Sequence, residues 1–230
     1  RRCFGEIKRS AHRKPTHRRE VDKEKYSFLA FQQNALQSSK ARGASWQVLG
    51  QQVLMGKLNI PVIPPEEVAK LELSEFALPR FEQAQQLAPY GLPSNLDAWD
   101  GYPAARERLF AMLSAHATNP ISLAGDTHNA WAFSLTNAQG EAVGVEWGTP
   151  GVSSPGLESY LPLPPGQMQA LLKGASPELV ACDTSQRGWT QVTLTPESAT
   201  VQWRFVSSVV EPTYQVSAGE PLVAERDTRR

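Results

Sequence analysis

A short apolar run at residues 121–124 constrains the fold of this chain more than any other stretch, because polar residues follow it directly. Pro120 marks the start of the run, so the pattern predicts a short buried strand. Gly125 lets the backbone turn sharply where the strand ends. Asp126 and His128 are then expected at the carboxyl end of the strand, where open α/β sheets place their ligand sites.

The Asp126-x-His128 pattern has two interpretations. A carboxylate and an imidazole two residues apart can both reach one metal ion or one phosphate group, which makes the pair a candidate for metal binding and catalysis. In the other interpretation, Asp126 caps a turn and His128 packs locally. A three-residue pattern of this kind is common by chance, so the surrounding sequence has to decide.

Helical and strand periodicities alternate along the chain and predict a mixed fold, α/β with α+β character. A helix at 103–115 leads into the strand just described and forms an α/β unit with it. Residues 131–135 and 141–147 are expected to pair as a hairpin. The other expected elements are helices at 25–41 and 167–173 and strands at 45–54, 179–181, 189–195 and 200–206.

Residues 56–98 contain six prolines and predict a long irregular connection with one or two helical turns around 66–73. Loops of this length are commonly lids or rims of functional sites, and we expect a rim over the active site here. At the other end of the chain, the tail from Ser217 is polar and is expected to be loose.

Charge is balanced overall but uneven along the chain. Lys and Arg together number 23, as do Asp and Glu, yet residues 1–25 hold ten basic and four acidic side chains, a difference of +6. We expect this head to be disordered and solvated, and a nucleic-acid-binding arm is the alternative. The expected organisation is a basic head at 1–25, one domain at 26–210 and a polar tail at 211–230.

The remaining composition excludes some classes of protein. Cys3 and Cys182 lie far apart and do not indicate a disulfide framework. No apolar run approaches the roughly 18 residues of a membrane span, and no signal peptide is recognisable. The chain begins with Arg, so we expect it to be processed or a piece of something longer.

Several separated motifs occur in a recognisable order. They are D-x-W-D-G-Y-P at 97–103, a helix, the strand with G-D-T-H-N-A-W at 125–131, and S-S-P-G at 153–156. This order resembles the PhoD-type alkaline phosphatases of the binuclear metallophosphoesterase superfamily. The segments at 46–55 and 182–189 also look like parts of that family, and the resemblance runs from about residue 26 to residue 205.

The resemblance implies a fold and an activity. The implied fold is the C-terminal part of a metallophosphoesterase-like β-sandwich flanked by helices. The implied activity is metal-dependent hydrolysis of a phosphate ester substrate, a monoester and, as a further expectation, a diester. Since the family is usually exported, a periplasmic or secreted location is expected.

The resemblance also implies site residues. Asp126 and His128 are expected to be catalytic and, with Asp100, to hold the metals, which in the family are calcium and iron. Asp100 has a second interpretation, because an Asp just before a helix can cap it. Asn129 belongs to the same motif as His128 and is expected to contact the substrate.

Two further residues are candidates for substrate binding. Gln52 lies in a Gly-Gln-Gln sequence that resembles a variant of a superfamily motif in which an Asn binds metal. Gln is longer than Asn, so a hydrogen bond from Gln52 to substrate is as acceptable as ligation. Arg187 can bind phosphate through its guanidinium or form an ion pair.

The chain departs from the family at its start, because the metal-ligand motifs of the family's first half are not found before Asp126. We therefore expect a truncated form with weak metal binding and little phosphatase activity by itself. The alternatives are a non-catalytic remnant and a nucleic-acid-binding protein led by the basic head; nucleic acid is not the expected partner, because Phe4 is the one aromatic residue among the basic side chains.

Overall fold

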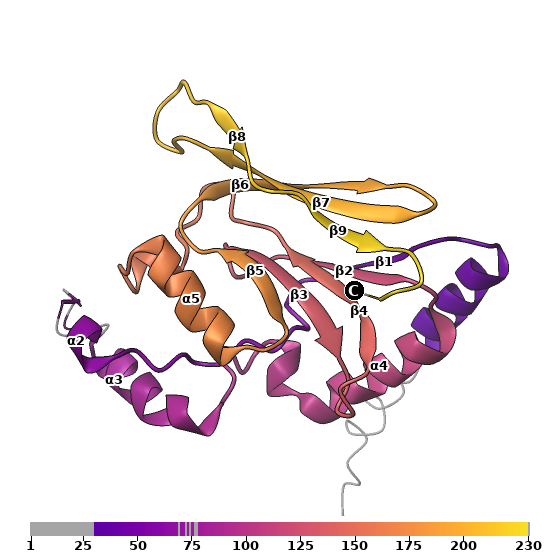
Figure 1. Cartoon of the computed structure of the whole chain (residues 1–230), viewed down its shortest axis with the longest axis horizontal. Coiled ribbons are helices and arrows are strands. Elements are labelled where there is room, and N and C mark those ends of the chain that lie inside the picture. The colour runs from indigo at the N-terminus through magenta and orange to yellow at the C-terminus, as the bar shows by residue number, and fades with distance from the viewer. Residues whose placement is uncertain (1–29, 69, 72, 74, 76–77, 230) are drawn as a thin grey trace, which may run out of the picture.

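The computed structural model describes residues 30–68, 70, 71, 73, 75 and 78–229. It shows two β-sheets packed face to face, with helices over the outer face of one sheet (Figure 1). The expected α/β sandwich flanked by helices is therefore confirmed. The basic head at 1–25 lies outside the described residues.

The secondary structure begins with a helix at residues 30–41, which is the described part of the helix expected at 25–41. The longer helices that follow are α2 (Pro65–Val68), α3 (Leu78–Leu87), α4 (Pro103–His116) and α5 (Pro165–Ala175). Single turns of 3-10 helix are η1 (Ala88–Tyr90), η2 (Trp99–Gly101) and η3 (Leu157–Ser159). None of the helices in this described part of the chain is both long and apolar enough to cross a membrane.

The first sheet has the strand order β1-β2-β4-β3-β5. Its strands are β1 (Gln47–Gly50), β2 (Pro120–Ala124), β3 (Ala130–Thr136), β4 (Ala142–Gly148) and β5 (Leu179–Asp183). β1 and β4 run parallel to β2, whereas β3 is antiparallel to both β4 and β5. The expected α4–β2 unit and β3–β4 hairpin are confirmed, and the parallel β1 and β2 end at one edge of the sheet.

The second sheet is built around β7 (Ser198–Val206), which pairs with β6 (Arg187–Leu194) along one edge. β8 (Val216–Ala218) and β9 (Leu222–Glu225) share the other edge of β7. The prediction of a loose tail from Ser217 is wrong. Its backbone pairs with β7, and Ala224 is buried between the sheets at 3% exposure.

Two cores lie on the two faces of the first sheet. Along β3, Trp131 and Phe133 face the helices, while Ala130 and Ala132 face the second sheet. This follows from strand geometry, since successive side chains point to opposite faces. Cys182 on β5 belongs to the helix-side core, and burial raises the pKa of its thiol to about 12.

β1 is shorter than expected, because it ends at Gly50 and the chain then runs irregularly through residues 51–59. Five consecutive backbone N–H groups in this segment donate to side chains. Met55 and Gly56 donate to Glu146, Lys57 to Glu178, Leu58 to Asp100, and Asn59 to the hydroxyl of Ser176. Side chains therefore replace the sheet ladder as the partners of this backbone.

The buried side chain of Arg106 holds one of these carboxylates in place. The Arg106 guanidinium donates to Glu178 at 2.7 Å and to the carbonyl oxygens of Met55 and Thr136. Arg106 also lies over the ring of Phe110, 4.1 Å from its centroid. Within the helix-side layer, the buried guanidinium of Arg106 and the buried carboxylate of Glu178 thus compensate each other's charge, as buried charges must.

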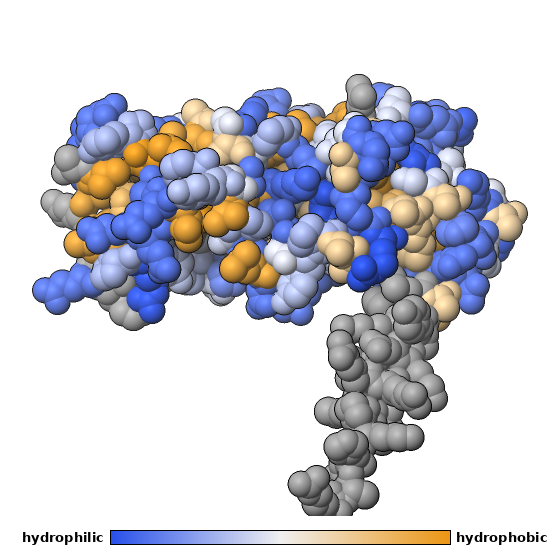
Figure 2. Space-filling model, turned by 90° about the horizontal axis from the view of Figure 1, so that it is seen from below, coloured by the Kyte–Doolittle hydropathy of each residue, from blue (hydrophilic) through white to orange (hydrophobic). Residues whose placement is uncertain are grey.

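The connection at 56–98 contains more helix than expected, since α3 runs for ten residues within it. Figure 2 views the molecule from below and shows apolar side chains gathered at the end where Figure 1 places α2 and α3. The exposed apolar residues of this connection are Val62, Leu78, Leu87, Tyr90, Leu92 and Leu96.

Candidate functional site

The loop after β2 carries two residues in an uncommon backbone conformation. Asp126 has φ 70° and His128 has φ 61°, and the side chains of both are exposed. The N–H of Thr127 donates to the carbonyl oxygen of Gly125 at 2.8 Å, so Asp126 is the central residue of a γ-turn with positive φ. That turn is rare and strained, although Asp and His tolerate positive φ better than most residues.

Three backbone hydrogen bonds tie the strained loop to the segments that follow β1 and β4. Gly125 N–H donates to the carbonyl of Gln52, Thr149 N–H to that of Ala124, and Gly151 N–H to that of His128. Strained backbone of this kind costs about 1–3 kcal/mol per residue and concentrates at functional sites. The observed strain therefore supports a functional role for the loop.

The imidazole of His128 is oriented by the loop after β4. Its Nδ1 lies 2.9 Å from the carbonyl oxygen of Pro155. Because a carbonyl only accepts, this contact requires the proton on Nδ1 and leaves Nε2 of the neutral ring as an unprotonated nitrogen. A nitrogen prepared in this way can ligate a metal or exchange a proton with substrate.

The two glutamines after β1 have different environments. Gln51 is tied into the interior, where it donates to Ser122 and Glu146 and accepts from Trp99 Nε1. Gln52 is exposed and lies beside Gly125, whose N–H donates to the backbone carbonyl oxygen of Gln52 at 3.0 Å. The structure therefore brings Gln52 to the loop of Asp126, as a substrate contact would require.

Asn129 and Arg187 meet at Gly156. A side chain at Gly156 would collide with Asn129 Nδ2 and would lie 2.7 Å from Glu158 Oε2 and 3.1 Å from Arg187 Nη2, so these side chains would have to shift to admit it. Asn129 Oδ1 accepts from Leu157 N–H, while its buried Nδ2 has no partner within the described residues. Arg187 forms an ion pair with Glu158, which is the second of the two interpretations of this arginine.

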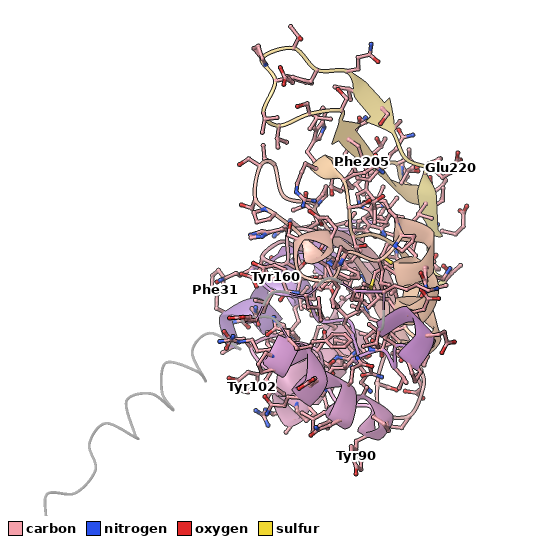
Figure 3. All side chains as sticks on the ribbon, turned by 90° about the vertical axis from the view of Figure 1, so that its left-hand side faces the viewer. Phe31, Tyr90, Tyr102, Tyr160, Phe205 and Glu220 are labelled. Atoms are coloured by element: carbon pink, nitrogen blue, oxygen red, sulfur yellow. The ribbon has the colours of Figure 1, made fainter. Side chains whose placement is uncertain are left out.

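A cavity of about 340 Å³ opens beside this loop. Thr127, His128 and Asn129 line one part of it, and the remaining lining is mostly apolar. Its rim includes Tyr160, which Figure 3 shows at the end of the molecule facing the viewer, between Phe205 of the second sheet and Tyr90. Residues of the 56–98 connection also line it, which agrees with the expected rim.

Asp100 lies in η2, directly before α4. Its half-buried carboxylate accepts from Leu58 N–H at 3.2 Å, and burial raises its pKa. It lies among the charged groups of Lys57, Arg106 and Glu178. In this structure the carboxylate anchors the 51–59 segment through Leu58, and its role as a metal ligand together with Asp126 and His128 stays a prediction. No side chain caps the start of α4.

A complete metal centre is not formed by the residues that the structure describes, since no three His, Cys, Asp or Glu side chains gather among them. The loop offers one carboxylate and one imidazole nitrogen, whereas calcium takes six to eight oxygen ligands. The donor set on the described residues thus does not fit calcium or iron by itself.

Sequence reasoning missed the residues that hold the site's surroundings, namely Glu146, Glu178, Arg106 and Glu158. One signal was available, because Glu146 interrupts the apolar strand at 142–148. A charge in the middle of such a strand indicates a buried partner. The partners themselves come from residues 55 and 56, which show no periodic pattern.

Comparison with known proteins shows the family to which the chain belongs. The family model described as PhoD-like phosphatase matches residues 6–203. Alkaline phosphatase D of Bacillus subtilis (strain 168) is 28% identical over 138 residues, which are 58% of this chain and 23% of that protein. A solved structure of PhoD superposes with a TM-score of 0.58 at 23% identity, over 86% of this chain and 33% of that one. The chain thus spans a third or less of the length of these relatives.

Proposed function

Because the chain belongs to the PhoD-like phosphatase family, we propose that it acts in the metal-dependent hydrolysis of phosphate monoesters. The observation that carries the proposal is the pair of exposed, strained residues Asp126 and His128 at the carboxyl end of β2. Both side chains are available to ligands, and the backbone strain has no structural use that the described contacts explain. The family resemblance of the G-D-T-H motif points to the same pair.

In this proposal each residue of the loop has a distinct task. The exposed carboxylate of Asp126 offers hard oxygen donors, and Nε2 of His128 either ligates or contacts the leaving-group oxygen. Gln52 lies next to the loop and can donate its side-chain amide to a phosphoryl oxygen. Charge that develops on the phosphoryl group is thereby met by preorganised donors.

Calcium and iron are the metals that we propose, from the family resemblance. The described residues supply two donors at the loop, so the proposal requires further donors from outside the described part of the chain. Phosphodiesters are proposed as additional substrates, and a periplasmic or secreted location is proposed for the protein. Arg187 contacts phosphate in this scheme only if its ion pair with Glu158 opens.

The test is hydrolysis of p-nitrophenyl phosphate, and of bis(p-nitrophenyl) phosphate for the diester activity, by the purified chain with calcium and iron added. We expect slow turnover that a chelator abolishes and that Asp126→Asn or His128→Gln reduces about a hundredfold. Asp97→Asn, which alters an exposed carboxylate of the motif at 97–103, is the matched control.

The contrary result is equally specific. Turnover that is no higher in the wild-type chain than in Asp126→Asn, with all metals present, would support the alternative of a non-catalytic remnant. The nucleic-acid alternative depends on the basic head, which lies outside the described residues, and the family match does not favour it.

A further inference from the structure

The cavity beside His128, called here the His128 cavity, has a two-part lining. One part is the strained loop with Thr127, His128 and Asn129. The other part comes from residues 155–161, α5 and the 56–98 connection, which includes α3. Its apolar members include Ile60, Ala84, Leu161, Met168 and Leu172.

Among the residues that the structure describes, no lysine or arginine lines the cavity. A phosphate group bound inside would therefore lack the cationic partners that phosphate sites use. An apolar group would instead lose contact with water and gain contact with the side chains of Met168 and Leu172, which are each 2% exposed. The chemistry of the cavity thus favours the organic part of a molecule over its phosphate.

The loop end of the cavity supplies a polar contact. Asn129 is 2% exposed, and its buried Nδ2 has no hydrogen-bond partner within the described residues. This Nδ2 faces Gly156 and is closed off from solvent, so the polar groups that this end of the cavity presents to a ligand are those of Thr127 and His128. His128 lies at the same end and can reach an oxygen that joins an organic group to a phosphoryl group.

We propose that the His128 cavity binds an apolar leaving group, such as an aromatic ring system, of the ester whose phosphoryl group lies at Asp126. This inference rests on the proposed function and assigns the substrate class to it. A volume of about 340 Å³ is at the small end of ligand pockets, which span about 300–1,000 Å³. It therefore suits a group of one or two fused rings better than a long chain.

The test compares two monoesters with the same phosphate group, 1-naphthyl phosphate and glycerol 3-phosphate, and the free alcohol 1-naphthol. Binding to the full chain is measured by calorimetry without added metal, so that no turnover occurs. We expect 1-naphthyl phosphate to bind at least about tenfold more tightly than glycerol 3-phosphate, from burial of its rings. We also expect 1-naphthol to bind in the absence of phosphate.

A matched pair of variants locates the binding. Ala84→Leu adds a larger side chain to the cavity wall from α3, whereas Ala170→Leu makes the same change on α5 in a neighbouring hollow. Both positions are in helices and at least partly exposed, and leucine is a good helix former, so both variants are expected to fold. We expect Ala84→Leu to weaken 1-naphthol binding at least fivefold, about 1 kcal/mol, and Ala170→Leu to leave it unchanged.

The inference is overturned if the two esters bind equally, or if the two leucine variants weaken 1-naphthol binding to the same extent. Failure of the proposed function gives a different pattern. In that case metal-dependent hydrolysis is absent, while 1-naphthol still binds and remains sensitive to Ala84→Leu. Asp126→Asn, which alters the loop outside the cavity lining, is expected to leave 1-naphthol binding unchanged.

Discussion

Two regions of this molecule use acidic side chains in opposite ways. In the helix-side layer, the carboxylates of Glu146 and Glu178 are buried and accept hydrogen bonds from the 51–59 segment and its neighbours. At the carboxyl end of β2, Asp126 is exposed and sits on strained backbone. The first arrangement stabilises the fold, whereas the second is strained and leaves its carboxylate available to a ligand.

Exposure and hydrogen bonding distinguish Asp126 from Asp100, whereas their spacing in the sequence does not. Asp100 lies in a family motif as Asp126 does, yet its contacts belong to the buried group. The physical difference is whether the carboxylate's hydrogen bonds are already satisfied by the protein. A carboxylate that anchors a backbone N–H keeps fewer lone pairs for a ligand than one that is fully exposed.

The largest expected effect is the loss of stability when the buried ion pair of Arg106 and Glu178 is broken. Arg106→Met removes the cation from Glu178 and leaves a buried carboxylate uncompensated, which costs about 3–5 kcal/mol. Urea unfolding measures the change. The control is Arg226→Met in the exposed pair with Asp227, where we expect a loss below about 1 kcal/mol. Equal losses in the two variants would show that the buried pair does not hold this layer.

The pH dependence of stability also tests the buried carboxylates. Burial raises the pKa of Glu146 above its ordinary value of 4.5, although the N–H groups of Gly56 and Met55 oppose the shift. Above the unfolded pKa, the native state therefore binds more protons than the unfolded chain. The free energy of unfolding should fall as pH rises through the folded pKa.

Urea unfolding at intervals between pH 4.5 and 8 measures this slope. Glu146→Gln removes the titrating proton and should flatten the curve, whatever its effect on absolute stability. The raised pKa of Asp100 contributes a fall of the same sign, so some slope should remain. A wild-type curve that rises across the interval would contradict the assignment.

A third prediction tests the strain at the β2 end. Asp126→Gly and Asp126→Ala both remove the carboxylate, but glycine alone accommodates φ 70° without steric cost. We expect the glycine variant to be about 1 kcal/mol more stable than the alanine variant in thermal unfolding. If alanine were as stable as glycine, the loop would not be strained in solution.

The smallest effect is expected at Asp100. Asparagine keeps an oxygen that can accept from Leu58 N–H, so Asp100→Asn should change the free energy of unfolding by about 1 kcal/mol or less. It should also leave phosphatase activity unchanged. A loss of activity comparable to that of Asp126→Asn would show that Asp100 takes part in the active site.

Local patterns in the sequence predicted much of the fold. The β3–β4 hairpin and the α4–β2 unit follow from periodicity and turn residues that lie within a few positions of each other. β8 and β9 were missed because these strands are short, largely exposed and defined by pairing with β7. α3 was missed because prolines and glutamines dominate its surroundings.

The candidate site was predicted in part for the same reason. The loop from Asp126 to Asn129 is local in sequence, and its position after a strand could be inferred. The ion pair of Arg187 with Glu158 and the anchoring role of Asp100 depend on contacts between residues 29 and 42 positions apart. No periodicity encodes such contacts, so the sequence left both residues with open interpretations.

The most direct test of the account is a titration of the chain with Mn²⁺, which binds oxygen and nitrogen donors and broadens nearby amide signals in NMR spectra. We expect broadening centred on residues 125–129 and Gln52, lost in Asp126→Asn and kept in Asp100→Asn. Broadening centred on Asp100 and Leu58, or unchanged by Asp126→Asn, would contradict it.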